Sequence, residues 1–469
     1  MKTPINKFAA LILLLGLAGC KVSKDLVLPV QSIPETFRDT QVDSTKSISK
    51  LSVQQFFTDI TLRNLIDTAL LRNYDLQIAM KNMTAAELLF RQTKLGNLPQ
   101  INLNITANSS RPSDNSLNGL SAGQFLGTKH IEDFNANLGL SWEADIWGKI
   151  GSQKKAALAS YLQSAEARKA VQMRLIASVA QGYYRLLMLD TQMLIARRNV
   201  ALTDSTLTMI KMQFDAGQLS SLAIQQAEAQ QLVAIQLVPA LEQDIAIQEN
   251  ALSILVGRLP AAIIRKGSLD RANFPAQLSA GIPAALLAQR PDVRSAELGL
   301  DLANAQVGIA KASMYPSLNI SATAGLNAFK ASNWFNIPAS LFGVVAGGIT
   351  QPLFQRKQLK TQFEVSKIER EKAVLQFRQS VLIAVGEVSD ELMRIKKLKQ
   401  QQVIAERRAE TLKLAVKNAG LLFNNGMANY LEVITAQSNA LQSELELASI
   451  KTAELNATVA LYRALGGGF

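Results

Sequence analysis

The feature that most restricts the fold is an internal duplication of the chain. When residues 70–107 are aligned without a gap with residues 287–324, nine of the thirty-eight positions are identical. Farther along the chain the offset becomes 209 residues, so that the segment 214–217 aligns with the segment 423–426. Two unrelated helix-rich stretches of similar composition would rarely match over this length with so few gaps. We therefore interpret the chain as two copies of one structural unit.

Each half contains the same order of predicted elements. A helix comes first, over about 62–96 and 283–314, because apolar residues recur there at helical spacing. Segments in which apolar and polar residues alternate follow the helix, and this pattern is typical of β-strands with one apolar face. Four such segments occur, at 101–108, 134–143, 318–327 and the glycine-rich 341–349.

The alternating segments are long enough to cross a bilayer as tilted strands. A half-buried strand of a soluble sheet has the same period, but no further strands are available to build such a sheet. Four strands cannot close a barrel, and open edges in hydrocarbon would leave backbone groups unsatisfied. Several copies must therefore share one barrel. Three copies give twelve strands and a duct, whereas two give eight strands, whose interior is filled by side chains.

Long helices follow the strands in both halves. Between Gly148 and Phe214 the pattern is helical for nearly seventy residues, which corresponds to about 100 Å of α-helix. In the second half, apolar residues spaced by threes and fours predict a coiled-coil seam. The seam comprises Val374, Phe377, Val381, Val385, Val388, Leu392 and Ile395. A barrel continued by a helical tube accounts for both the strands and the helix lengths.

The long helices are interrupted at two repeat-related glycines, Gly217 and Gly426. Glycine adopts positive φ without a steric penalty, so it can end one helix just before the next begins. We therefore predict two antiparallel helical hairpins whose tips point away from the strands. Pro239 falls within the returning helix of the first half and is predicted to kink it.

The first twenty residues predict export. Two lysines precede an apolar run of about ten residues, which is too short to span a bilayer and has the size of a signal peptide. The run ends in the segment 17–20, Leu-Ala-Gly-Cys, which resembles the lipobox of bacterial lipoproteins. This resemblance implies cleavage before Cys20 and acylation of its thiol, for example with palmitate. The alternative is an ordinary export signal followed by a free core cysteine. Because Cys20 is the only cysteine, we expect no disulfide bond.

These observations divide the chain into five predicted parts, two of which are the repeats. Each repeat contains a helix, two strands and a long helical hairpin. The parts are a lipoprotein signal peptide (1–19), an extended N-terminal tether (20–59), the first repeat (60–257), a linker (258–282) and the second repeat (283–469).

The composition argues against nucleic-acid binding and against catalysis. The net charge is +12, but the basic pairs lie in helical patterns near acids or glutamines, without interleaved aromatic residues that could stack on bases. His130 is the only histidine and lies in a predicted loop, which excludes a histidine metal cluster and a Ser-His-Asp triad. No glycine-rich phosphate loop precedes a helix. We therefore expect no enzyme activity, no cofactor, no metal site and no nucleic-acid partner.

Four stretches resemble motifs of the TolC-like outer-membrane efflux factors, specifically the lipoprotein branch called the NodT family. They are 142–149 (WEADIWGK), 290–297 (RPDVRSAE), 308–317 and 351–354 (QPLF). The resemblance covers about residues 60–466. It implies an α+β membrane protein, a homotrimer whose twelve-stranded β-barrel takes four strands from each protomer and is continued by a long periplasmic α-helical barrel.

The resemblance also implies a function and partners. The chain would be the outer-membrane channel of a tripartite efflux system, anchored by lipid in the bacterial outer membrane. It would serve as a passive exit duct for small molecules. These would be handed over by an inner-membrane pump of the RND type and a periplasmic adaptor (membrane fusion) protein. The alternative is a non-porous coiled-coil envelope lipoprotein with a structural role, which leaves the alternating strands unexplained.

Two kinds of site follow from the resemblance. The tips that dock the adaptor correspond to Ala216, Gly217, Gln218, Asn425, Gly426 and Met427. The periplasmic gate corresponds to Leu431, Glu432 and Thr435. Family members often carry aspartate at one or both of the positions matching Glu432 and Thr435, and this chain departs from that pattern at both. Three copies of Glu432 would still bring three carboxylates together on the axis and favour cations, whereas an ordinary solvated helix glutamate is the alternative.

Overall fold

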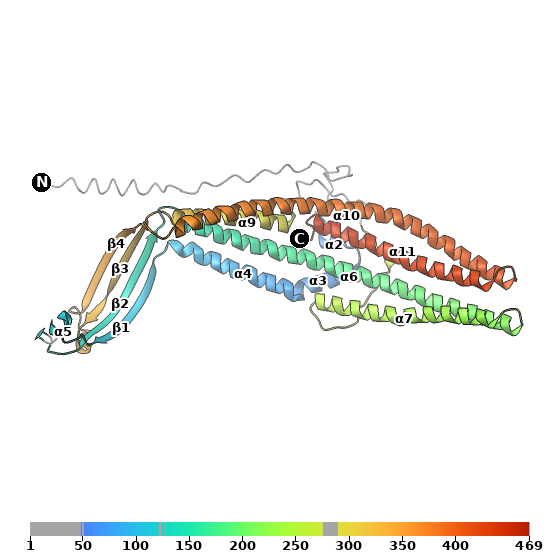
Figure 1. The fold of residues 1–469 in the computed structure, drawn as a ribbon, viewed down its shortest axis with the longest axis horizontal. Helices are drawn as coiled ribbons and strands as arrows, with labels where there is room; N and C mark the ends of the chain where they lie inside the picture. Colours follow the sequence, from blue (N-terminus) through green and yellow to red (C-terminus); the bar gives the residue numbers. More distant parts are fainter. Residues whose placement is uncertain (1–47, 49–50, 122–123, 126, 275–288, 469) are drawn as a thin grey trace. The chain divides into compact units, whose positions relative to one another are not determined.

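The computed structural model describes residues 48, 51–121, 124–125, 127–274 and 289–468, and it consists of helices and one sheet (Figure 1). Two compact units are present. The sheet unit comprises the described residues of Thr84–Leu162 and Leu298–Leu375, and the helical unit those of Val30–Met83, Gln163–Glu297 and Gln376–Phe469. Each unit therefore takes segments from both halves of the chain. Cys20 and the predicted signal peptide lie outside the described residues.

The sheet has four antiparallel strands in chain order: β1 (Gln100–Ser110), β2 (Ile131–Ala144), β3 (Ser317–Ala328) and β4 (Leu341–Thr350). The four alternating segments are thus confirmed as strands. The register places Leu103 opposite Leu138, and Leu138 opposite Ala324, so that apolar residues share one face. On β1 the apolar side chains are exposed, Leu103 to 65%. The protomer alone therefore does not cover this apolar face.

The long helices confirm the duplication. Helices α6 (Lys149–Asp215) and α10 (Gln358–Asn424) each have 67 residues, and α7 (Ser221–Leu255) and α11 (Tyr430–Ala464) each have 35. All four pairs of bounds differ by the same 209 residues. Pro239 lies inside α7 without ending it. No described helix contains a stretch that is both long and apolar enough to cross a membrane.

The remaining described helices precede or connect these elements. They are α2 (Val53–Phe56), α3 (Ile60–Arg72), α4 (Tyr74–Lys94), α5 (Leu117–Ser121) and α9 (Pro291–Ala312), with short 3₁₀ turns η2 (Leu95–Asn97), η4 (Leu269–Arg271) and η6 (Ala331–Asn333).

The first predicted helix, over 62–96, is wrong as a single helix, because the structure divides it at Asn73. This residue has an extended backbone, with φ −62° and ψ 128°. Its side-chain oxygen accepts the N–H of Leu76 at 3.0 Å, and its amide donates to the carbonyl of Leu255 at 3.0 Å. The side chain thus caps α4 and anchors the end of α7, which offsets the loss of helical backbone bonds at this residue.

The predicted tether, 20–59, also differs from the structure in its last part. Ser52 forms a capping box at the start of α2, and Phe56 and Phe57 are fully buried. The Phe56 ring stacks on Tyr462, with ring centroids 4.0 Å apart, and the Tyr462 hydroxyl donates to the carbonyl of Leu51 at 2.7 Å. Two adjacent aromatic residues bury too much apolar surface to remain in an extended tether.

The predicted linker, 258–282, behaves similarly over its described part. Ile263 and Leu269 are buried, and Phe274 stacks on Phe56 with ring centroids 4.8 Å apart. Arg265 forms ion pairs with Asp190, at 2.6 Å, and with Glu249. Residues 258–274 therefore belong to the packed helical unit.

The segment 142–149 forms the corner between β2 and α6. Asp145 accepts the N–H groups of Ile150 and Gly151 at 2.9 and 2.8 Å, which caps the helix start. The Trp147 indole donates to the carbonyl of Pro316 at 2.7 Å, and Gly148 has φ +73°. The role of this motif is thus structural: it fixes the turn from β2 into α6 within the sheet unit.

Candidate functional site

The two hairpin tips have the same backbone geometry. Gly217 and Gly426 have φ of +70° and +71°, as predicted for the helix breaks. In each tip the glycine N–H donates to the carbonyl three residues earlier, and the next N–H donates to the carbonyl five residues earlier, at 2.8–3.1 Å. This is the Schellman motif, which satisfies the last carbonyls of a helix. In both repeats, the chain therefore reverses direction between the two helices of the hairpin through the same Schellman motif.

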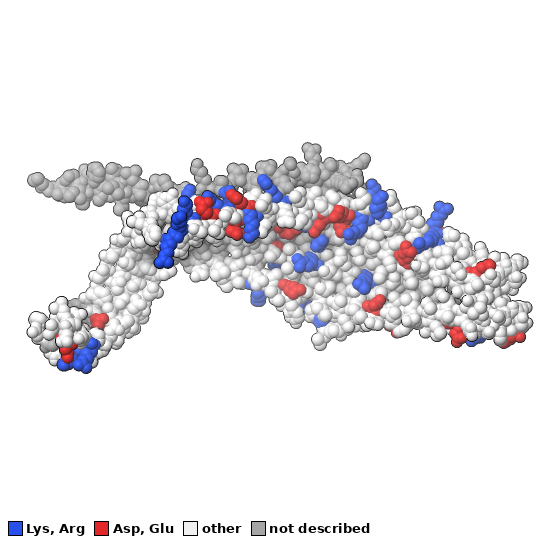
Figure 2. Space-filling view, viewed as in Figure 1, with Lys and Arg blue, Asp and Glu red and all other residues white. Residues whose placement is uncertain are grey.

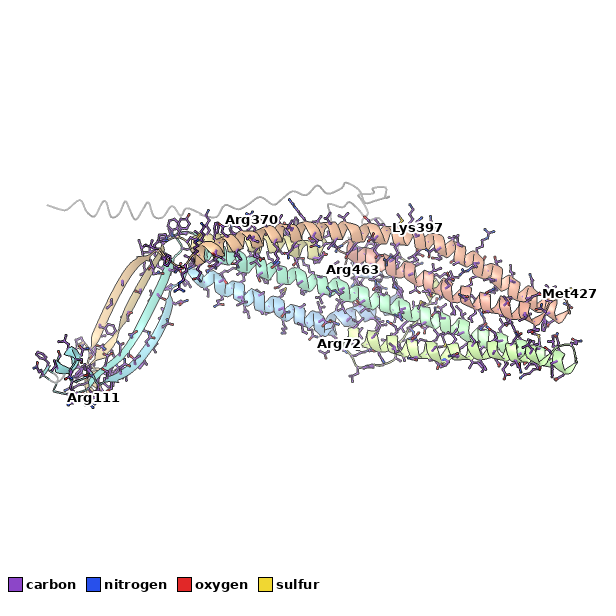
Figure 3. All side chains as sticks on the ribbon, viewed as in Figure 1. Arg72, Arg111, Arg370, Lys397, Met427 and Arg463 are labelled. Carbon is purple, nitrogen blue, oxygen red and sulfur yellow. The ribbon has the colours of Figure 1, made fainter. Side chains whose placement is uncertain are left out.

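The tip residues are exposed, and the hairpins that carry them pack together. Met427 is 74% exposed, and Figure 3 places it at the end of its hairpin. Beneath the tips lies a small apolar core that draws on both hairpins. It comprises Leu207, Ile210, Ala223, Ala227, Phe423 and Val433. The structure thus brings the two predicted tip segments together on one end of the helical unit.

The three predicted gate residues lie on an exposed face of α11. Asn429 caps this helix by accepting the N–H of Glu432 at 3.1 Å. Leu431, Glu432 and Thr435 are exposed, whereas Val433 and Gln437 on the opposite face are buried. The Gln437 amide donates to the Thr206 hydroxyl at 2.7 Å, which fixes the rotation of α11 against α6. The rest of the described protomer therefore leaves the Leu431, Glu432 and Thr435 face uncovered.

Sequence reasoning missed the role of Arg290, which it used only as part of a family motif. The guanidinium is 7% exposed and forms ion pairs with Asp292 at 2.6 Å and Glu387 at 2.9 Å. It also donates to the carbonyl of Ala464 at 3.1 Å. Burial by itself would lower the pKa of Arg290, but the hydrogen bonds and charges of Asp292 and Glu387 outweigh burial and raise it. Arg290 thus ties the start of α9 to α10 and to the end of α11.

The position of Arg290 has a counterpart in the first repeat, where a neutral asparagine makes the equivalent hydrogen bond. Asn73 and Arg290 are repeat-related, and each donates to the last-turn carbonyl of a repeat-related helix, Leu255 in α7 and Ala464 in α11. In the sequence, the proximity of Arg290 and Asp292 was the only local sign of this cluster.

The sequence profile described as the outer membrane efflux protein family matches residues 65–258 and 282–467. The chain belongs to the outer membrane efflux protein family. The two matched segments correspond closely to the two repeats, and each contains one hairpin tip and two of the four strands.

Full-length relatives support this membership. The toluene efflux pump outer membrane protein TtgF of Pseudomonas putida is 30% identical, with 98% of this chain and 97% of that protein covered. The cation efflux system protein CusC of Escherichia coli is 27% identical, with 97% of each covered. The open-state structure of the MtrE outer membrane channel of Neisseria gonorrhoeae has a TM-score of 0.85 at 25% identity, covering 96% of this chain and 98% of that one.

This efflux protein is therefore an outer-membrane component of an efflux system, with the fold of the TolC-like channels. The predicted family, fold class, function and outer-membrane localisation are confirmed. Members of the family are transport ducts, not enzymes, and form trimeric channels of tripartite systems. The alternative of a non-porous spacer leaves both the sheet and these full-length relationships unexplained.

Proposed function

We propose that three copies of this chain close into one passive exit duct. The sheet supports this proposal because β1 and β4 each have one neighbour within the described protomer and so offer edges to further copies. Exposed apolar side chains on α10, such as Leu382 and Ile404, would be covered by neighbouring copies. Relatives of similar identity are named for cations and for toluene. We therefore assign substrate selection to an inner-membrane pump of the RND type and not to the duct.

The second part of the proposal concerns the two hairpin tips. We assign Ala216, Gly217, Gln218, Asn425, Gly426 and Met427 to docking of a periplasmic adaptor. Two exposed, repeat-related turns on one end of the helical unit offer similar surfaces side by side. An adaptor built from helical hairpins could therefore contact both tips in the same way.

Gly426→Val tests the docking surface. Valine at φ +71° should cost about 1–3 kcal/mol locally and misdirect the hairpin. Efflux by cells and adaptor capture by the purified protein should both fall, while the yield of assembled channel stays near wild type. Gly420→Val is the matched control, because Gly420 lies in α10, the helix that leads into this tip, has open space around it and lacks a positive φ. Normal adaptor capture by the Gly426→Val channel would remove the tips from the docking surface.

We also assign the gate to Leu431, Glu432 and Thr435. Three copies of their exposed face would meet around the axis of the duct, with Glu432 supplying the carboxylates and Leu431 the apolar seal. In planar bilayers, Glu432→Gln should lower the cation preference, because three negative charges leave the constriction. Leu431→Ala should raise conductance by widening it. Glu228→Gln, an exposed glutamate of the other hairpin, is the control. If neither variant differs from the control, the gate lies elsewhere.

The lipid anchor remains a prediction from the sequence. We propose that Cys20 carries the acyl chains, because it ends a lipobox-like segment and is the only cysteine. Cells fed labelled palmitate should label the wild-type protein and not Cys20→Ser. Equal label in both proteins would contradict the assignment. The sheet supplies its own membrane contact, so membrane insertion of Cys20→Ser is expected once its signal is cleaved.

A further inference from the structure

Basic residues gather at one end of the sheet, where the four strands join the helices. The segments 94–100, 143–156, 311–317 and 350–360 contain eight lysines and arginines and two acids, a formal excess of six positive charges. This is half of the net charge of the chain, +12. Figure 2 shows lysine and arginine side chains where the sheet gives way to the helices. Because the chain is an outer-membrane protein with helices in the periplasm, this end faces the periplasmic leaflet.

The rest of the sheet lacks this excess. The loops at its other end, 110–133 and 328–340, contain three basic and three acidic residues. The strand segments between the two ends, 101–109 and 134–142 in the first repeat and 318–327 and 341–349 in the second, contain no charged residue. An uncharged band bordered by cations on one side only is the pattern expected where one membrane surface carries anionic head groups.

Three of these cations are free to bind a ligand. Arg356, Lys357 and Lys360 are exposed, and no carboxylate among the described residues pairs with them. Two other basic side chains at this end are already engaged: Lys149 pairs with Glu143 at 3.0 Å, and Lys94 lies over the Phe90 ring, 4.3 Å from its centroid. The three free cations occupy the turn from β4 into α10 and the first turn of that helix.

The backbone of this turn is strained by residues that are not glycine. Arg356 and Lys357 have φ of +49° and +62°, a region that glycine occupies at much lower cost. Glycine at these two positions would form the turn at a lower conformational free energy, yet the chain has cationic residues there. Strain that is retained at an exposed, charged position points to a role for the side chains.

Apolar and aromatic side chains lie beside the cations. Leu353 and Phe354 are 92% and 87% exposed, three and two residues before Arg356. Two tryptophans belong to the same boundary, and the Trp142 indole donates to the carbonyl of Asn97 at 2.8 Å. Aromatic residues are enriched where a protein crosses from hydrocarbon to head groups. Leu353 and Phe354 are thus placed to enter hydrocarbon while the adjacent cations remain at phosphate depth.

We propose that Arg356, Lys357 and Lys360 bind the phosphate groups of anionic phospholipids in the periplasmic leaflet. Binding by this cluster fixes the depth of the turn between β4 and α10 relative to the membrane surface. The ligand chemistry is a phosphodiester at a bilayer surface, recognised by charge and by the N–H groups at the start of α10. The assignment rests on the outer-membrane location and is independent of the tips and the gate.

Lipid retention by the purified full-length protein tests this site. The protein is mixed with equal amounts of phosphatidylglycerol and phosphatidylethanolamine, and the retained lipids are counted by native mass spectrometry. Wild type should prefer phosphatidylglycerol. A variant with Arg356→Gly, Lys357→Gly and Lys360→Gln should lose this preference by about tenfold or more. Glycine at the first two positions relieves the positive-φ strain, so this variant is expected to fold.

A matched control removes the same number of charges elsewhere on α10. Lys367 and Lys372 pair with neighbouring glutamates at 2.6 and 3.2 Å, and Arg370, labelled in Figure 3, lies between them. Changing all three to glutamine should leave the lipid preference intact. Equal preference in wild type and the glycine variant, or equal loss in the control, overturns the proposal.

Two further readouts separate other occupants of the site. Millimolar inorganic phosphate, compared with chloride at equal ionic strength, should not displace phosphatidylglycerol from wild type; displacement would assign the site to free phosphate and refute lipid binding. The glycine variant should keep the oligomeric state of wild type. A changed oligomeric state with unchanged lipid counts would assign these residues to contact between copies and also refute it.

Discussion

Replacing Arg290 by methionine is expected to destabilise the helical unit by about 2–4 kcal/mol. Removing one partner of a buried ion pair leaves uncompensated charge, which typically costs about 3–5 kcal/mol. Here the carboxylates of Asp292 and Glu387 are 48% and 38% exposed, so water compensates part of the loss. The end of α11 also loses the hydrogen bond to the Ala464 carbonyl. Thermal unfolding followed by circular dichroism, with hydrogen exchange over 459–466, would measure both effects.

Arg294→Met is the matched control for this prediction. Arg294 lies one turn farther along α9, is 44% exposed and pairs with Glu297. Loss of such a surface pair should cost less than about 1 kcal/mol. Equal destabilisation by the two variants would show that the Arg290 cluster is not a structural anchor.

The pH dependence provides a second check on the Arg290 cluster. Burial raises the pKa of Asp292, but its hydrogen bond to Arg290 and the positive charge outweigh burial and lower it. A lowered pKa in the folded state stabilises the protein above the unfolded pKa, and this stabilisation is lost as pH falls through the folded value. The stability difference between wild type and Arg290→Met should therefore shrink in acid. A difference that stayed constant from neutral to acidic pH would contradict the ion-pair explanation.

Gly466→Ala and Gly257→Ala are expected to destabilise the protein by at least about 3 kcal/mol each. Both glycines have positive φ, +84° and +70°. A Cβ atom would also lie 2.6 Å from the Gln289 carbonyl oxygen in the first case and 2.4 Å from that of Arg72 in the second. Backbone atoms cannot move aside cheaply, so steric overlap adds to the cost of positive φ. The same thermal unfolding measurement applies.

The chain supplies its own controls for this effect. Gly217 and Gly426 have φ near +70° and end helices by the same motif, but a Cβ atom there meets nothing within 4 Å. Gly217→Ala and Gly426→Ala should therefore show only the backbone cost, about 1–2 kcal/mol. If all four alanine variants were equally stable, close packing at Gly257 and Gly466 would have no energetic role.

The features that were predicted correctly share a local origin. A strand with one apolar face requires alternation within ten residues, and an uninterrupted helix requires only that proline and turn residues be absent. Gly217 and Gly426 could be recognised because few other residues accept the backbone angles of a helix reversal. The assignment of the tips to adaptor docking and of Leu431 and Glu432 to the gate came from family motifs and stays a prediction.

The errors arose where a residue's role depends on a distant partner. From the sequence alone, Asn73 is compatible with a continuous helix. The break between α3 and α4 at this residue becomes favourable only because its side chain bonds the carbonyl of Leu255, 182 residues away. Phe56 and Phe57 lie in a polar stretch that resembled a tether. Their burial depends on Tyr462 and Phe274, which the fold brings to them from the far end of the chain and from the supposed linker.

The sequence by itself determined the duplicated order of helix, strands and hairpin, because periodicity and backbone preference act within one or two turns. It also determined the family, through motifs that remain contiguous in the chain. Only the tertiary structure decided that Arg290 meets Glu387 and the Ala464 carbonyl, the latter 174 residues away. A buried charge can be stabilised by any suitably placed carboxylate or carbonyl, and the local sequence pattern carries no information about which one the packed helices will present.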